Sequence, residues 1–377
     1  MGAAILGVGM TQFGRHDGRS FGDLGIEAVL AALESASVQW EQVDAVVCGN
    51  VVGGMLPGQR VLREIGASDL PVINVENACA SAGTALHLAI SMVERGEQGM
   101  VLALGIEQLS VLGGGLLPQD ADDIEVLQGA TLPSSYAMRA RRYMHDHGMT
   151  AEQLALQPLK AHRNGSLNKH VQVHRSWTVE DVVQARMIAD PLTLFMCCPN
   201  GDGAAAAVVC STELARRLTS RPVEVAASVV VSGRFSPVRD FKAPETTVTA
   251  AAQAYESAGI GPDDLDLVEC HDPFAVAEIL YYEILGLAPP GGGVELLVSG
   301  ATRLEGKIPV NPSGGLMARG HPIGATGLAQ VAEAFWQLRG EAGARQLAEP
   351  RAALTHVTGG GISGYDNGAC AIHVLKR

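Results

Sequence analysis

The amino-acid sequence contains an internal repeat, and this repeat restricts the fold more than any other feature. Residues 32 to 50, "ALESASVQWEQVDAVVCGN", align without gaps on residues 254 to 272, "AYESAGIGPDDLDLVECHD". The identical positions are Ala32, Glu34, Ser35, Ala36, Asp44, Val46 and Cys48 in the first copy and Ala254, Glu256, Ser257, Ala258, Asp266, Val268 and Cys270 in the second. Each copy has the pattern of the end of an amphipathic helix, a loop with an acidic residue and an apolar strand. The chain therefore builds the same helix-to-strand unit twice.

A second similarity extends the repeat. The segment "SAGTALHLAISMVERGE" after Cys79 is similar to "GATGLAQVAEAFWQLRGE" after His321. Both segments have a helical pattern, and each leads to an apolar strand, at residues 100 to 105 and 352 to 357. The start of each helix and the strand that follows it thus occupy equivalent positions in the two copies.

These repeats divide the chain into two α/β halves. We predict an N-terminal half at residues 1–222, which includes a less regular, more polar insert at about 120–190, and a C-terminal half at residues 223–377. Strands that alternate with helices at this spacing predict sheets covered on both faces. The helix openings "ASAG" and "GATG" permit close packing between layers, because no large side chain intervenes. The predicted fold class is a duplicated, layered α/β fold.

The composition excludes several functional classes. The formal net charge of −13 argues against nucleic-acid binding, which needs a basic surface. Of the 377 residues, 47% are hydrophobic and 18% charged, and no stretch reaches the roughly 20 apolar residues of a membrane-spanning helix. The 7 cysteines include no zinc-type CxxC pair, which predicts reduced thiols. We expect a cytoplasmic protein that binds no metal, membrane or nucleic acid.

A basic segment lies between residues 136 and 175 of this acidic chain. It contains Arg139, Arg141, Arg142, Lys160, Arg163, Lys169 and Arg175, against Asp146 and Glu152. Two interpretations remain open, a solvated helical surface and a docking site for the phosphates of a cofactor.

Cys79 lies at the predicted N-terminus of a helix, among the small residues of "NACASAG". Unpaired N–H groups and the helix dipole favour an anion there. We therefore expect a lowered pKa for this thiol and nucleophilic chemistry. The alternative for a lone cysteine is a small buried side chain without a chemical role.

Three further segments combine polar residues with glycines or strand ends. In residues 311 to 327, "NPSGGLMARGHPIGATG", His321 precedes a helix start equivalent to that of Cys79, so the repeat predicts that the two side chains meet as a Cys–His pair. His271 in "ECHDPF" follows a strand at its carboxyl end, where α/β proteins build sites, although a structural histidine also fits. The glycines at 359 to 361 either offer N–H groups to an oxyanion or form a simple hairpin.

In this order and spacing, "NACASAG", "HDPF", "NPSGG…GHPIGATG" and the C-terminal "GGG" resemble the thiolase superfamily, specifically the sterol-carrier-protein-type thiolases. The resemblance covers the whole chain: "GVGMTQFG" resembles the first strand and turn, and "CCPNGDGAAAAVV" resembles the loop and strand that close the insert. It implies the duplicated thiolase fold with αβαβα layers and an inserted loop domain, usually as a homodimer.

The resemblance also implies roles for individual residues. Cys79 matches the cysteine that takes up the acyl group from coenzyme A, and His321 matches the histidine that activates this cysteine. His271 matches a residue that contributes to the oxyanion site, and Asn311 an asparagine that supports it. Gly361 is expected to supply the second oxyanion N–H, beside the amide of Cys79.

Contacts to coenzyme A are implied for a further group of residues. Cys198 falls where many thiolases have a serine near the pantetheine arm, and Ser313 and Gly314 belong to the loop before His321. In the basic segment, Arg139 and Arg142 are expected near the nucleotide phosphates. Coenzyme A and acyl-CoA are expected as substrates, with no tightly bound cofactor.

The sequence departs from the thiolase pattern at the second acid–base group, which moves the α-proton of the substrate. Most thiolases use the cysteine of a C-terminal CxG motif, and the sterol-carrier type can use the cysteine of HDCF. Here the CxG position is Val357 or Thr358, and the HDCF cysteine is replaced by Pro273. The candidate replacements, each with a structural alternative, are His356, Tyr365 and Cys198.

The sequence thus predicts an acyl-CoA C-acyltransferase of lipid metabolism that cleaves or forms a β-ketoacyl-CoA through an acyl-cysteine. The first alternative is a retro-aldol lyase acting on a β-hydroxyacyl-CoA, as in thiolase-like proteins that act on steroid side chains; the presence of Cys79 argues against it. The second alternative is a non-catalytic partner subunit. Since many bacterial members of this group work with a second subunit, a small zinc-ribbon/OB-fold protein is a candidate partner.

Overall fold

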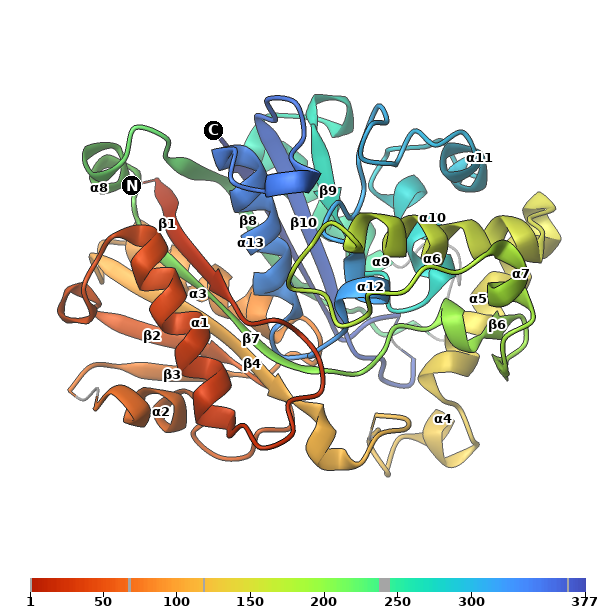
Figure 1. Ribbon diagram of the computed structural model, residues 1–377, viewed down its shortest axis with the longest axis horizontal. Helices are drawn as coiled ribbons and strands as arrows, with labels where there is room; N and C mark the ends of the chain where they lie inside the picture. The colour runs from red at the N-terminus through yellow and green to blue at the C-terminus, as the bar shows by residue number, and fades with distance from the viewer. Residues whose placement is uncertain (1, 67–68, 118, 237–244, 365) are drawn as a thin grey trace.

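A nine-stranded β-sheet runs through the molecule (Figure 1). The computed structural model describes residues 2–66, 69–117, 119–236, 245–364 and 366–377. The strands of the large sheet are β1 (Ala3–Met10), β2 (Ala45–Gly49), β3 (Val72–Val75), β4 (Met100–Gln108), β7 (Asp202–Ser211), β8 (Val223–Ser232), β9 (Leu267–Glu269), β10 (Ala352–Gly359) and β11 (Ala369–Lys376). Their order is β3-β2-β4-β7-β1-β8-β11-β10-β9.

The sheet consists of two related halves. The order β2-β4-β7-β1 in the first half is repeated as β9-β10-β11-β8 in the second, and the halves join where β1 pairs with β8 at Ala4 opposite Glu224. The repeated aspartates have the same role in both. Asp44 accepts backbone N–H groups at the start of β4, and Asp266 accepts them at the start of β10, at 2.7 to 2.9 Å. The duplication predicted from the sequence is thus visible in single hydrogen bonds.

Helices cover both faces of each half-sheet. The larger ones are α1 (Phe21–Ala36), α3 (Ser81–Glu94), α9 (Glu245–Ala258), α10 (Ala275–Ile284) and α13 (Thr326–Arg339), and the shorter ones are α2 (Pro57–Leu62), α8 (Thr212–Leu218), α11 (Gly293–Val298) and α12 (Gly315–Arg319). α3 and α13 each contact strands of both halves, whereas α1 packs on the outer face of the first half and α9 on that of the second. These contacts give the layer order αβαβα and confirm the predicted layered α/β fold. Among the described residues, none of the helices is both long and apolar enough to cross a bilayer.

The central pair of helices approaches very closely at the glycines of "ASAG" and "GATG". A Cβ atom on Gly327 would lie 2.6 Å from the backbone nitrogen of Gly83. Real Cβ atoms do not approach a backbone nitrogen so closely, so only glycine fits at this crossing. The small residues therefore bring the N-terminal ends of α3 and α13 together.

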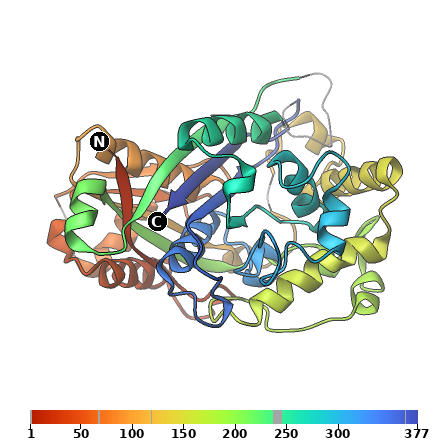
Figure 2. The same cartoon turned by 90° about the horizontal axis from the view of Figure 1, so that it is seen from above.

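The insert between β4 and β7 forms a helical lobe. It contains α4 (Ile124–Leu127), α5 (Leu132–His147), α6 (Ala151–Gly165), α7 (Val179–Val183) and the hairpin of β5 (Met187–Ala189) and β6 (Leu192–Thr193). Figure 2 shows these helices at the end of the molecule away from the N-terminal half, with the C-terminal half between. α6 packs on α10 and α12, and the buried Lys160 of α6 forms an ion pair of 2.5 Å with Glu278 of α10. The insert is thus anchored on the C-terminal half.

Candidate active site

Cys79 lies in a tight turn between β3 and α3. The N–H of Ala80 donates to the carbonyl of Asn77 at 3.0 Å, and Ala78 has a φ of 48°, in a region that non-glycine residues seldom adopt. Gly359, at the end of β10, packs against this turn, since a Cβ on it would lie 1.9 Å from the Asn77 oxygen. The strained turn and the glycine contact together present the Cys79 side chain beside the C-terminal half.

Cys79 and His321 form a hydrogen-bonded pair, with 3.2 Å between Sγ and Nε2. On the other side of the imidazole, Nδ1 lies 2.7 Å from Oγ1 of Thr326, whose hydroxyl can donate to the carbonyl of Pro322 at 3.1 Å. When the Thr326 hydrogen is directed to Pro322, its oxygen accepts from Nδ1–H of His321 and leaves Nε2 as an acceptor for the thiol. The structure therefore brings together the two residues that the repeat places at equivalent helix starts, in an arrangement suited to proton transfer.

Burial keeps both members of this pair neutral. It raises the pKa of the Cys79 thiol to about 12, although the backbone N–H groups of Gly360 and Cys79 act in the opposite direction. Burial also lowers the pKa of His321 well below its usual value. The expectation of a lowered thiol pKa is thus corrected, because desolvation outweighs the helix terminus. The contact expected for Gly361 is made by Gly360, and Gly361 itself is exposed.

His271 completes a cluster with this pair. One ligand atom each from Cys79, His271 and His321 lies within 4.8 Å of the others. His271 follows β9, and its Nδ1 is 2.9 Å from Oγ1 of Thr358, whereas its buried Nε2 has no hydrogen-bond partner among the described residues. Burial lowers the pKa of His271 to about 3, so the ring is neutral. A neutral ring with one unpaired nitrogen is available to a substrate oxygen or proton.

Asn311 lies behind this cluster. Its Oδ1 accepts the backbone N–H of Cys270 at 2.8 Å, and its Nδ2 donates to Glu278 at 2.6 Å. Because Cys270 precedes His271, the amide side chain fixes the backbone that carries the histidine. The hydrogen bonds of the Asn311 amide go to Cys270 and Glu278, so Asn311 would act on an oxyanion by positioning His271.

The loop residues Ser313 and Gly314, which we predicted near coenzyme A, are buried. The hydroxyl of Ser313 donates to Glu269 at 2.7 Å, and a Cβ on Gly314 would lie 2.7 Å from the Cα atom of Gly165. These contacts give both residues a packing role beneath α6, and their contact with coenzyme A stays a prediction.

Carboxylates pair with much of the basic segment, several from outside it. The ion pairs are Arg141 with Asp190, Arg142 with Asp146, Lys160 with Glu278 and Arg163 with Glu305. Arg139 is buried, with its guanidinium carbon 5.1 Å from the ring centre of Tyr136. Of the two arginines predicted at the phosphates, Arg142 lies at the surface, and Arg139 is buried where the insert meets the C-terminal half, with its guanidinium donating to the carbonyl of Asp366 at 3.4 Å.

The candidates for the second acid–base group lie at different depths. Cys198 lies close enough to Cys79 that a charge on that thiol raises its pKa. His356 is fully buried next to His271. Its Nδ1 atom lies 3.5 Å from the backbone nitrogen of His271, and its Nε2 atom lies 3.3 Å from the hydroxyl of Thr247. Tyr365 lies outside the described residues. Among the described residues, His271 is the histidine whose ligand atom lies within 4.8 Å of both Cys79 and His321.

Sequence reasoning missed the two threonines that orient the histidines. Thr326 lies five residues after His321, inside the helix opening, and Thr358 is the last residue but one of strand β10. A hydroxyl in a run of otherwise small or apolar residues is the signal that could have indicated them. Of the two candidates for the CxG position, Val357 and Thr358, it is Thr358 that contacts the cluster, through its 2.9 Å hydrogen bond with His271.

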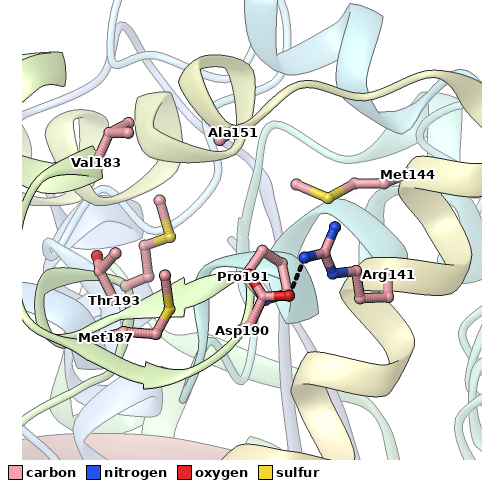
Figure 3. Close-up of a pocket in the computed structure, with 9 residues that line it drawn as sticks. Arg141, Met144, Ala151, Val183, Met187, Asp190, Pro191 and Thr193 are labelled. Atoms are coloured by element: carbon pink, nitrogen blue, oxygen red, sulfur yellow. Dashed lines mark hydrogen bonds and ion pairs between the residues drawn. The ribbon is translucent and has the colours of Figure 1, made fainter.

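A cavity of about 280 Å³ lies apart from this cluster, within the insert. Figure 3 shows the methionines Met144 and Met187 on its wall and the ion pair of Arg141 with Asp190 beside it. Neither Cys79 nor its histidine partners line the cavity, so it is a feature of the inserted lobe.

Comparisons with protein families cover both halves of the chain. The family described as "Thiolase, N-terminal domain" matches residues 3–213, and "Thiolase C-terminal domain-like" matches residues 227–367. The chain belongs to the thiolase family. The subunit BbsB of benzoylsuccinyl-CoA thiolase from Thauera aromatica is 43% identical over 95% of this chain and 94% of its own length. An acetyl-CoA acetyltransferase from Methanothermobacter thermautotrophicus is 42% identical over 99% of both chains. This thiolase is therefore an acyltransferase.

Two solved structures extend the comparison. The Ltp2–ChsH2(DUF35) aldolase has a TM-score of 0.86 and 26% identity over 100% of this chain and 97% of its own. The Acat5 thiolase from Ascaris suum, solved with coenzyme A, has a TM-score of 0.75 and 18% identity over 100% of both chains. The second match shows that the molecule has the thiolase fold.

Proposed function

We propose that this thiolase cleaves or forms a β-ketoacyl-CoA through an acyl group carried on Cys79. The observation that carries the proposal is the 3.2 Å contact between Sγ of Cys79 and Nε2 of His321, with Nδ1 of the imidazole held by Thr326. Such a pair is the requirement for a cysteine nucleophile activated by a base.

In the first stage, the thiol proton moves to Nε2 of His321 as Sγ attacks the ketone carbon. The oxyanion that forms lies near the N–H groups of Cys79 and Gly360, both of which are directed at the sulfur. Each such donor contributes on the order of 3 kcal/mol to transition-state stabilisation. The bond between Cα and Cβ then breaks, an acyl-CoA enolate leaves, and Cys79 keeps the acyl group.

The enolate needs a proton at Cα, and the proton that His321 took from Cys79 is its source. We assign the passage of this proton to the site of His271, whose neutral Nε2 can accept it and hand it on to Cα. Its Nε2 is buried without a partner, and its Nδ1 is held by Thr358. Neither of the usual thiols is present, because the CxG position is Val357 or Thr358 and the HDCF position is Pro273. In the final stage, coenzyme A takes the acyl group from sulfur, with His321 as the base.

The experiment is detection of the acyl-enzyme by intact mass after incubation with acetyl-CoA and longer acyl-CoA esters. Wild-type protein is expected to gain one acyl group, and Cys79→Ala to gain none. Cys210→Ala, which removes a buried thiol of β7, serves as the matched control and keeps the adduct. Absence of an adduct with every acyl-CoA, together with turnover of a β-hydroxyacyl-CoA by Cys79→Ala, would establish the retro-aldol alternative instead.

That alternative is kept because the Ltp2–ChsH2(DUF35) aldolase shares the architecture at 26% identity. The intact Cys79–His321 pair favours the thiolase reaction, since a retro-aldol step without a covalent intermediate needs no nucleophile.

A second subunit is also part of the proposal: BbsB is named as a subunit, and the aldolase is a two-component structure. We propose a homodimeric core that binds a small zinc-ribbon/OB-fold partner. Light scattering of the chain expressed with and without its genomic neighbours measures both assemblies.

A further inference from the structure

The resting active site has the donor set of a site for a soft divalent metal ion. A thiol and two imidazoles offer ligand atoms within 4.8 Å of one another, and the Sγ atom of Cys79 is 3.2 Å from Nε2 of His321. Zinc binds sulfur at about 2.3 Å and imidazole nitrogen at about 2.0–2.1 Å, so three tetrahedral ligands lie about 3.3–3.6 Å apart. Side-chain movements of about 1 Å therefore bring the cluster to zinc geometry.

His271 provides an independent observation that points to a ligand. Its Nε2 is buried and lacks a hydrogen-bond partner among the described residues, which is unfavourable for a polar atom away from water. In the proposed reaction a transferred proton occupies the lone pair of this nitrogen. Between turnovers, the same lone pair is open to a cation.

The surroundings of the two imidazoles are those of metal ligands. His321 is held through Nδ1 by Thr326, and His271 through Nδ1 by Thr358. Metal-binding histidines are oriented in this way by a hydrogen bond to the ring nitrogen that does not bind the metal. Nε2 of His321 thereby faces Cys79, and Nε2 of His271 is left as the unpaired ring nitrogen among the described residues.

We propose that Cys79, His271 and His321 bind one Zn²⁺ ion, or a cation of the same class, in the resting enzyme, and that this cation inhibits acylation. On binding, the Cys79 thiol releases its proton to solvent, and its sulfur and the two Nε2 atoms each donate an electron pair to the metal. No electron transfer takes place. A water molecule fills the fourth position, as in zinc sites with three protein ligands. Acylation of Cys79 removes the thiolate, so the acyl-enzyme does not bind the cation.

The rival site in the chain is the adjacent pair Cys197 and Cys198, both partly buried and free of disulfides. Sγ of Cys197 donates to the carbonyl of Thr193 at 3.4 Å. A soft cation bound there would involve no histidine of the cluster, so variants of the two sites separate them.

The test is a titration of chelator-treated protein with Co²⁺ alone, which reports the thiolate-to-cobalt charge-transfer band without any enzymatic assay. We expect a band that saturates at one equivalent, is absent in Cys79→Ala, and requires at least tenfold more Co²⁺ in His271→Ala. The control variant Cys197→Ala/Cys198→Ala keeps the band. Circular dichroism establishes that each variant is folded.

A second measurement uses wild-type crystals soaked in Zn²⁺. The anomalous peak is expected about 2.0–2.3 Å from the three ligand atoms. A wild-type protein without a cobalt band, a band that survives in Cys79→Ala, or an anomalous peak elsewhere overturns the proposal. The acyl-enzyme experiment is separate from these outcomes, because an acyl adduct can form whether or not the free enzyme binds metal.

Discussion

Replacing Lys160 with methionine tests whether the basic segment anchors the insert or binds coenzyme A. Lys160 is buried on α6, and its ammonium lies 2.5 Å from Glu278, 2.9 Å from the carbonyl of Val310 and 3.1 Å from the hydroxyl of Tyr282. Methionine keeps most of the apolar stem but removes the charge. The variant therefore leaves the Glu278 carboxylate buried without its cation.

The expected loss of stability follows from this burial. Removing one partner of a buried ion pair costs about 3–5 kcal/mol, because the remaining charge is desolvated without compensation. Glu278 keeps hydrogen bonds from Gln157 at 3.1 Å and Asn311 at 2.6 Å, so we expect the lower end, about 3 kcal/mol. Arg163→Met on the same helix removes an ion pair with Glu305 whose side chains are 56% and 69% exposed, and should cost less than about 1 kcal/mol.

The assay is urea unfolding followed by tryptophan fluorescence. Trp177 reports the insert directly, since its ring stacks on Phe195 at 4.5 Å between ring centres. We expect a large shift of the unfolding midpoint for Lys160→Met, partial recovery in Lys160→Met/Glu278→Gln, and little change for Arg163→Met. Equal shifts in both single variants, or a raised KM for coenzyme A with unchanged stability in Lys160→Met, would refute the anchoring role.

Three further predictions concern the cluster itself. Thr326→Val leaves the Nδ1 of His321 unpaired, an unmade bond of about 1–3 kcal/mol, so acylation in single-turnover mass spectrometry should slow roughly 10- to 100-fold with little change in KM; an unchanged rate contradicts the orienting role. Gly359→Ala places a Cβ 1.9 Å from the Asn77 oxygen, so the nucleophile turn must shift, and acylation should fall far more than in Gly361→Ala, where the site is open. Because burial raises the pKa of Cys79 to about 12, the thiolate fraction grows with pH up to that value. Alkylation by iodoacetamide should then rise about tenfold per pH unit between pH 7 and 10, and a plateau below pH 8 would show a lowered pKa instead.

The repeat allowed the sequence to predict the fold and the central pair. Two equivalent helix openings, each rich in small residues, place Cys79 and His321 at corresponding positions, and the Gly83–Gly327 contact shows the close packing that such openings permit. A helix-opening pattern describes only neighbouring residues. Because the chain contains this pattern twice, it also predicts that Cys79 and His321, which are 242 positions apart, lie close together.

Features that depend on contacts across the chain were predicted poorly. The partners of the basic segment are distant in sequence: Asp190 lies 49 residues from Arg141, and Glu305 lies 142 residues from Arg163. The pKa direction of Cys79 depends on burial, which a helix-start pattern does not reveal. The N–H group that contacts Cys79 belongs to Gly360 and not to the predicted Gly361, because β10 ends at Gly359. In a run of three glycines, no side chain indicates where the strand ends.

The neutral state of the cluster links its burial to its chemistry. A buried thiolate with a buried imidazolium would require the protein to desolvate two charges in the empty site. With Cys79 and His321 both neutral, that cost is absent until a substrate enters. In the proposed mechanism, charge then appears on the substrate oxygen during attack, close to the sulfur at which N–H groups of Cys79 and Gly360 are directed. His271 is also neutral in the free enzyme, and its Nε2 has no partner among the described residues. In the proposed mechanism this ring carries charge only while it passes a proton to the enolate. A thiolase without its second cysteine can therefore keep a site that becomes charged only during the reaction.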